Sequence, residues 1–589
     1  MTLSSSETVG KPKPTAESPA GDNPAESSGA SDSRLAVARR LYTYGVALVS
    51  YLVTLAALNA LLKIIDQSWL LTVGDGGAAL YTANFGVFHR DALASNGGLL
   101  LVAVPLFLIH WGYAQSLVRR DPEEAGAGMR KFFLYIAHAA AMIYGLLAFH
   151  RLLVGFGTLA VGAPLADNDV WPSGWLHAGL VVGLSFALAR YWLAVVQSDG
   201  DFGREEDIAG FWRRLYQTAV GLIGLGLMIF GGAEMIQAIW QAFMNTLAFT
   251  AGDLLWRVSL LNGLGTLIVG VYVTRLNWQL WQEICHANPR EQSRGLRRFY
   301  LYGAIVIGAL ATLVPAAGLL EEILRILLGV GTGDRWQLLN GLGRPVSLIP
   351  LGIAAWIWYW RYLKTEEASA PASNESETIR RVYYYSVAFT GLILLWFGAV
   401  EIVQAGLDRL FITPSASTAD FWIDGLARGI SLLSVGAPVW AFHWRVVERV
   451  ARRRDETGRM ERVSGPRRVY LYGVALIGAL LILVFLAQVA YRGFLWLLGD
   501  PNAGFLSPQA ASDLARSAIA AVLWIVHIQA IRTDGKLGTR APAPAHTPVS
   551  GPDLEPARAA LTTRIQRLEA ELAAARAELA QLETKPPDA

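Results

Sequence analysis

The chain has few charged residues, a single cysteine and no apolar leader at its N-terminus. Only 16% of its 589 residues are charged, against roughly 25% in soluble domains, so the composition favours one membrane body over several soluble domains. The lone Cys285 excludes an internal disulfide and any multi-cysteine metal centre. A formal net charge of +3 gives no reason to expect a nucleic-acid partner.

Two segments lack the apolar runs found elsewhere. Residues 1–33 are rich in Ser, Glu, Pro, Ala and Gly, which predicts a disordered cytoplasmic tail and not a cleavable signal peptide. Residues 536–555 contain repeated Pro and Ala and are predicted to form a linker.

An internal repeat occupies the rest of the chain. Six times, a basic pair, a hydrophobic residue and an aromatic open a long apolar segment, and the aromatic recurs every 83 to 91 residues. The six copies are Arg39-Arg40-Leu41-Tyr42, Arg130-Lys131-Phe132-Phe133, Arg213-Arg214-Leu215-Tyr216, Arg297-Arg298-Phe299-Tyr300, Arg380-Arg381-Val382-Tyr383 and Arg467-Arg468-Val469-Tyr470.

Each copy holds two apolar stretches long enough to cross a bilayer. The sequence therefore predicts an all-α polytopic membrane protein of about twelve transmembrane helices, arranged as six tandem two-helix hairpins. The predicted membrane repeats are residues 34–120, 121–200, 201–285, 286–366, 367–456 and 457–535.

The connections between spans differ in charge. Those on the side of Arg39, Arg119 and Lys364 carry most of the Lys and Arg, which predicts that this side is cytoplasmic. Both termini are then cytoplasmic, and the expected location is the plasma membrane. Because every repeat enters the membrane in the same direction, inverted-repeat transporter folds are disfavoured, while parallel-repeat transporters remain possible.

Small residues recur within the first helix of each repeat. The residues eight positions after the opening aromatic are Ser50, Ala141, Gly224, Gly308, Gly391 and Gly478. Most residues three positions after it, such as Gly45 and Gly473, are small too. Helices in lipid associate through close backbone approach, so we expect these residues to lie at helix contacts.

The second helix of most repeats ends with a polar or aromatic residue followed by tryptophan, as in His110-Trp111 and His443-Trp444. Such side chains suit the headgroup boundary. The basic-aromatic opening, the apolar hairpin and this ending resemble a bacterial membrane family catalogued as domain-of-unknown-function family 5671, over roughly residues 34–535 in tandem copies. The resemblance implies an integral membrane protein and supplies no activity.

Three acidic residues are candidate ligand-binding residues. Glu234 and Glu401 each lie eighteen residues after an opening aromatic, and Glu321 lies at a similar depth. Ionisable groups inside a membrane suggest an ion or substrate path. However, eighteen helical residues span about 27 Å, which places these acids near the extracytoplasmic interface. We favour the interfacial position.

Six histidines fall in apolar segments, and paired imidazoles can hold haem. Three of them occupy one repeat position, where Tyr and Asn stand in other copies, so a polar anchor fits better and we expect no cofactor or metal. No catalytic motif stands in a supporting context, so we expect no enzyme. The six are His110, His138, His150, His177, His443 and His527.

The C-terminal segment, residues 556–583, carries a heptad seam. Its apolar residues alternate spacings of four and three, and they are Leu561, Ile565, Leu568, Leu572, Ala575, Leu579 and Leu582. This pattern predicts a cytoplasmic coiled coil that makes the chain a homo-oligomer. An amphipathic helix docked on its own protein is the alternative.

Two functions are compatible with these features. The first is a non-enzymatic membrane scaffold or sensor that self-associates through its coil, with the lipid bilayer as its other partner. The alternative is a channel or secondary transporter that uses the acidic residues near the extracytoplasmic side of the bundle.

Overall fold

A computed structural model describes most of the chain, and it is helical throughout. The described residues are 24–70, 79–162, 175–200, 203, 205, 207–247, 255–329, 339–369, 373–411, 421–499, 508–539 and 562–572. No strand occurs within these ranges. Eleven helices among them are long and apolar enough to cross a membrane, which indicates a multi-pass membrane protein.

The long helices fall into three groups of four. The first group is α1 (Pro24–Leu70), α2 (Ala79–Arg120), α3 (Gly128–Ala160) and α4 (Trp175–Ser198), with the 3₁₀ turn η1 (Pro122–Gly126) between α2 and α3. The second is α5 (Asp207–Leu247), α6 (Leu255–Ala287), α7 (Gly295–Leu327) and α9 (Gly343–Ser369), with η2 (Pro289–Ser293) between α6 and α7. The third is α10 (Asn374–Phe411), α11 (Phe421–Ala451), α13 (Gly465–Leu497) and α14 (Pro508–Thr539), with the short α12 (Glu456–Val463) before α13.

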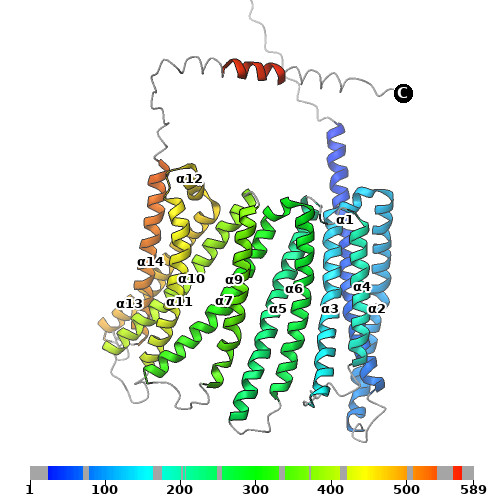
Figure 1. Cartoon of the computed structure of the whole chain (residues 1–589), viewed down its shortest axis with the longest axis horizontal. Helices are drawn as coiled ribbons and strands as arrows, with labels where there is room; N and C mark the ends of the chain where they lie inside the picture. Colours follow the sequence, from blue (N-terminus) through cyan, green and yellow to red (C-terminus); the bar gives the residue numbers. More distant parts are fainter. Residues whose placement is uncertain are drawn as a thin grey trace, which may run out of the picture.

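The packing follows the same plan in every group. Consecutive long helices pack against each other in pairs, and the first helix of a group also packs against the third and fourth. The third helix then contacts the first two helices of the next group, α3 with α5 and α6, and α7 with α10 and α11. The three groups therefore stand in a row in chain order (Figure 1).

Small residues eight positions after the opening aromatic lie at close helix contacts, as predicted. A Cβ added at Gly308 would lie 2.7 Å from the backbone nitrogen of Trp356, and one at Gly391 would lie 2.6 Å from that of Trp440. The prediction for the position three residues after the aromatic is wrong at Gly45 and Gly473, where nothing lies within 4 Å. These two glycines are half-buried and make no close contact with another helix.

The ends of the chain differ partly from expectation. Helix α1 begins at Pro24, so residues 24–33 of the predicted disordered tail are helical. Proline suits the first position of a helix because the backbone N–H that it lacks would have no partner there. Residues 1–23 and most of the predicted linker lie outside the described residues. Within the predicted coil, residues 562–572 are helical. Leu561, Ala575, Leu579 and Leu582 lie outside the described residues.

Candidate functional site

The basic pairs that open the repeats gather at one end of the bundle, here called the basic end. Arg213, Arg297 and Arg467 have 0% of their surface exposed, and Arg130 has 1%. The same end carries the start of α1 and the finish of α14 (Figure 1). A buried guanidinium is costly unless carboxylates pair with it, so the partners of these arginines define the site.

In the second half of each group, the first residue of the basic pair binds an acid at the end of the fourth helix. Arg130 donates to both carboxylate oxygens of Asp199 at 2.9 and 2.8 Å. Arg467 binds Asp534 in the same two-pronged way at 2.6 and 2.9 Å. Arg297 reaches Glu366 only at 3.4 and 3.3 Å. Each contact ties the third helix of a group to the fourth.

In the first half of each group, the second arginine binds a glutamate in the turn between the second and third helices. The three nearest contacts, each 2.8 Å, are Arg40 with Glu124, Arg214 with Glu291 and Arg381 with Glu461. The turns are fixed locally: Asp121 caps η1, Asn288 caps η2 and Asp455 caps α12.

Glu291 binds both arginines of its basic pair. It pairs with Arg213 at 3.1 Å as well as with Arg214, and its side chain is 2% exposed. Burial alone would raise the pKa of Glu291, but hydrogen bonds from Arg214 and the charge of Arg213 outweigh burial and hold that pKa below its usual range. Glu124 has a lowered pKa for the same reasons, with Arg40 and Arg39 as its partners.

Sequence reasoning missed this pairing, although a signal was present. Glu124, Glu291 and Glu461 each stand six residues before the basic pair of the following repeat. No such glutamate precedes Arg213 or Arg380. The basic pairs of odd-numbered repeats thus bind a glutamate in a turn, and those of even-numbered repeats bind an acid at the end of the fourth helix. Because these two kinds of ion pair alternate, the pattern of the site recurs every four helices.

Tryptophans from the second helix of each group cover the arginines. The guanidinium carbon lies 5.4 Å from the Trp111 ring at Arg130, 5.2 Å from Trp278 at Arg297 and 5.6 Å from Trp444 at Arg467. Trp111 and Trp444 are buried. These two rings stack against cations inside the bundle, and their position at the headgroup boundary stays a prediction.

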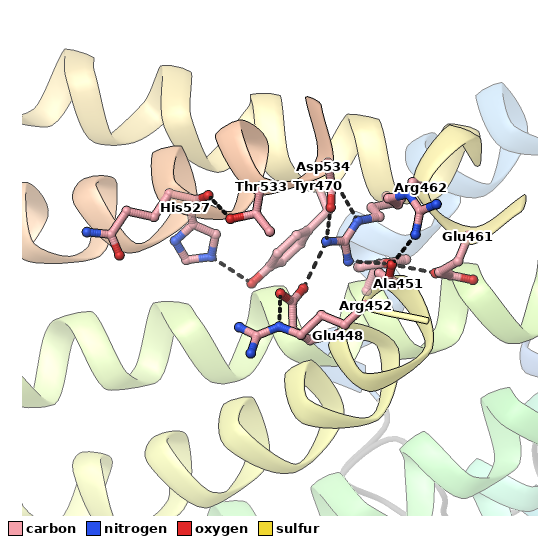
Figure 2. A network of polar contacts seen from close by, with 12 residues as sticks. Glu448, Ala451, Arg452, Glu461, Arg462, Tyr470, His527, Thr533 and Asp534 are labelled. Carbon is pink, nitrogen blue, oxygen red and sulfur yellow. Dashed lines mark hydrogen bonds and ion pairs between the residues drawn. The ribbon is translucent and has the colours of Figure 1, made fainter. Parts of the chain in front are cut away.

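A polar aromatic pair lies beside the arginine in two of the groups. Tyr300 hydrogen-bonds Tyr359 between their hydroxyls at 2.9 Å, and the Tyr470 hydroxyl contacts Nε2 of His527 at 3.1 Å (Figure 2). The first group has Phe133 at the equivalent place. These pairs join the third and fourth helices next to the ion pair.

Four other membrane histidines contact side chains or backbone carbonyls of the bundle. His138 contacts the Tyr216 hydroxyl at 2.8 Å, and His150 contacts Thr266 at 3.2 Å. His110 and His443 each contact the backbone carbonyl four residues earlier at 2.8 Å. Nδ1 of His527 makes the same kind of contact, to Leu523 at 2.7 Å. Among the described residues, no cluster of His, Cys, Asp and Glu could hold a metal ion.

Glu321 and Glu401 lie at the opposite end of the bundle, where the second group meets the third. Arg428 of α11 stands between them, 3.6 Å from Glu321 of α7 and 4.0 Å from Glu401 of α10. Arg325 pairs with Asp424 across the same boundary at 3.0 Å. Sequence reasoning did not identify these basic partners.

Glu234 occupies the equivalent place on α5, in the helix that faces the first group. Its backbone lies close to α6, since a Cβ on Gly263 would be 3.0 Å from the carbonyl carbon of Glu234. Ala60 holds the corresponding position in α1, which has no preceding group to face. The structure therefore brings Glu321 and Glu401 together but leaves Glu234 at a separate boundary.

The comparison with family models agrees with the four-helix period. The model described as "Domain of unknown function (DUF5671)" matches residues 40–189, 214–348 and 381–526. Each match spans two of the predicted two-helix repeats and corresponds to one four-helix group. No curated protein and no solved structure matches the chain.

Proposed function

Because the chain belongs to the DUF5671 family and carries three tandem copies of that domain of unknown function, we propose that it is a non-enzymatic membrane scaffold or sensor that self-associates through its C-terminal coil. In this proposal α9 is the twelfth span, although it is not among the eleven most apolar helices. The basic end then faces the cytoplasm, following the excess of Lys and Arg on that side.

An uncovered apolar seam on the C-terminal helix is the observation that carries the proposal. Ile565, Leu568 and Leu572 are 54%, 57% and 53% exposed, and they recur with the spacing of a coiled-coil core. A second copy of the same helix would cover this seam, since hydrophobic burial drives association.

The ion pairs of the membrane body support a structural role for its charges. The arginines at the basic end tie helices within a copy, and Arg428 links Glu321 of the second copy to Glu401 of the third. We propose that Glu234, Glu321 and Glu401 fasten neighbouring copies. The competing channel or transporter function would need these carboxylates to be free to exchange ions along a path. The positive charge of Arg428 instead offsets the negative charges of Glu321 and Glu401.

The test of self-association uses the whole chain in detergent or nanodiscs. Leu572→Asp places a charge in the seam, and we expect it to lower the oligomeric fraction seen by cross-linking and native mass spectrometry. Ala570→Asp adds the same charge on the outward face of the same helix and should leave the oligomer intact. A wild-type monomer at micromolar concentration, or equal behaviour of the two variants, contradicts the proposal.

A further inference from the structure

The middle copy differs from the third in how its buried arginine is satisfied. Arg467 in the third copy binds two carboxylates, Asp534 and Glu448, and the contact to Glu448 is 2.8 Å. The position of Glu448, four residues after Trp444, is held by Gln282 in the middle copy. Gln282 bonds the Tyr362 hydroxyl at 2.8 Å. Arg297 is thus left with one acid, Glu366, at 3.3 to 3.4 Å.

Several buried donors around Arg297 have no acceptor. Among the described residues, no hydrogen-bond partner exists for Arg297 Nη1, Trp281 Nε1, Asn277 Nδ2 or Gln217 Nε2. All four residues are at most 5% exposed. Arginine and the indole of tryptophan can only donate, so at least two of these groups require an acceptor from elsewhere.

These donors share one place between α5, α6 and α7. The guanidinium carbon of Arg297 lies 5.0 Å from the Trp281 ring, and Asn277 is one turn before Trp281 on α6. A Cβ on Gly221 would lie 2.5 Å from both Asn277 Nδ2 and the Tyr300 ring. Gln217 is one turn before Gly221 on α5 and bonds Arg213.

The other copies carry different side chains at the corresponding positions. Ala47 and Ala388 stand where the middle copy has Gly221, and both are fully buried. Ala114 and Val447 stand in place of Trp281. The middle copy has therefore gained the indole donor of Trp281, and the absence of a Cβ at Gly221 lets Asn277 Nδ2 and the Tyr300 ring pack against α5.

The charges there also leave a positive excess. Four buried arginines face three buried carboxylates, and every one of these residues is less than a tenth exposed: Arg213, Arg214, Arg297, Arg298, Glu205, Glu291 and Glu366. Unpaired donors with an uncompensated positive charge in a low dielectric favour an anion.

We propose that the middle copy binds a small monovalent inorganic anion of the size of chloride, held by Arg297, Trp281 and Asn277 in place of the carboxylate that Glu448 supplies in the third copy. This site does not depend on the self-association proposed above. Each bound anion would link α6 to α7 and add to the stability of the folded chain by mass action.

Equilibrium binding of radiolabelled chloride to the purified full-length protein tests the proposal, with gluconate holding the ionic strength constant. We expect saturable binding of one chloride per chain and an unfolding temperature that rises with chloride. Gln282→Glu places a carboxylate where Glu448 stands in the third copy, so it should weaken chloride binding at least tenfold while the protein stays folded. Trp281→Phe removes one donor and should weaken binding in the same direction.

Gln115→Glu is the matched control, because Gln115 holds the equivalent position in the first copy, where Arg130 is already bound by both oxygens of Asp199. This variant should bind chloride as the wild type does. Absence of saturable binding by the wild type would mean that water satisfies the donors, and the proposal fails. It also fails if Gln282→Glu binds normally or if Gln115→Glu loses binding.

Discussion

Buried arginines dominate the chemistry of individual residues in this chain. Arg130, Arg213, Arg297 and Arg467 are enclosed by helices and aromatic rings, so each depends on a nearby carboxylate for its charge. Glu291 pairs with both arginines of the third basic pair, Arg213 and Arg214. Removing one partner of a buried pair leaves an uncompensated charge and is strongly destabilising.

Glu291→Gln should therefore lower the free energy of unfolding by about 3–5 kcal/mol. Because the pKa of Glu291 is lowered in the folded state, its contribution is fully present above the ordinary glutamate pKa of about 4.3. The contribution is lost as pH falls through the lowered folded-state pKa. Unfolding of purified protein in detergent, followed from pH 7 into the acid range, should show a flatter acid dependence for the variant.

Glu456→Gln is the control, since Glu456 pairs with Arg459 on an exposed face of α12. Exposed pairs contribute little, so this variant should match the wild type in stability. Equal stability of Glu291→Gln and Glu456→Gln would contradict the structural role given to the buried pairs.

Close contacts between helices depend on glycine at particular turns. Gly308 of α7 faces Gly352 and Trp356 of α9, and the carbonyl of Gly352 lies 3.0 Å from where a Cβ on Gly308 would be. Gly473 of α13 has nothing within 4 Å. The same residue type thus sets a helix contact in one element and has no neighbour in another.

Gly308→Ala should lower the free energy of unfolding by about 1–3 kcal/mol, because the added methyl group overpacks the contact between α7 and α9. Gly473→Ala should instead raise it by up to about 1 kcal/mol, since alanine is the better helix former and the site is open. Chemical unfolding of both variants in the same detergent gives the comparison. Destabilisation by Gly473→Ala equal to that by Gly308→Ala would refute the assignment of the contact.

At the scale of the whole molecule, three four-helix copies stand in a row, and each copy begins at the same end of the bundle (Figure 1). The arginine clusters then lie at one end, and the acids that join the copies lie at the other. Glu456 marks the basic end, and Leu498, which is 81% exposed, marks the opposite end.

A membrane-impermeant maleimide applied to intact cells should label Leu498→Cys and spare Glu456→Cys, if the basic end is cytoplasmic as the distribution of Lys and Arg predicts. The native Cys285 is 3% exposed and should give little background. Labelling of both variants in opened membranes confirms that each thiol is reactive. The reverse pattern in intact cells would invert the predicted orientation.

The sequence by itself determined the helical membrane body, the tandem repetition and the small residues at the plus-eight contacts. These features depend on local composition and on spacing along one helix, such as the eight residues from Tyr300 to Gly308. The same local reasoning located Glu234, Glu321 and Glu401. It assigned them no partners, because a pattern within one helix does not say which helix lies opposite.

Only the tertiary structure decided the partners of the charges. Arg297 and Glu366 are 69 residues apart, and Arg214 and Glu291 are 77 apart, so their pairing depends on how separate helices pack. Because these pairs alternate along the chain, the repeating unit is four helices long. The sequence motif alone predicts a repeat of two helices. The replacement of Glu448 by Gln282 likewise matters because the arginine beside each position is buried. Burial makes the missing carboxylate costly, and the sequence alone does not show that burial.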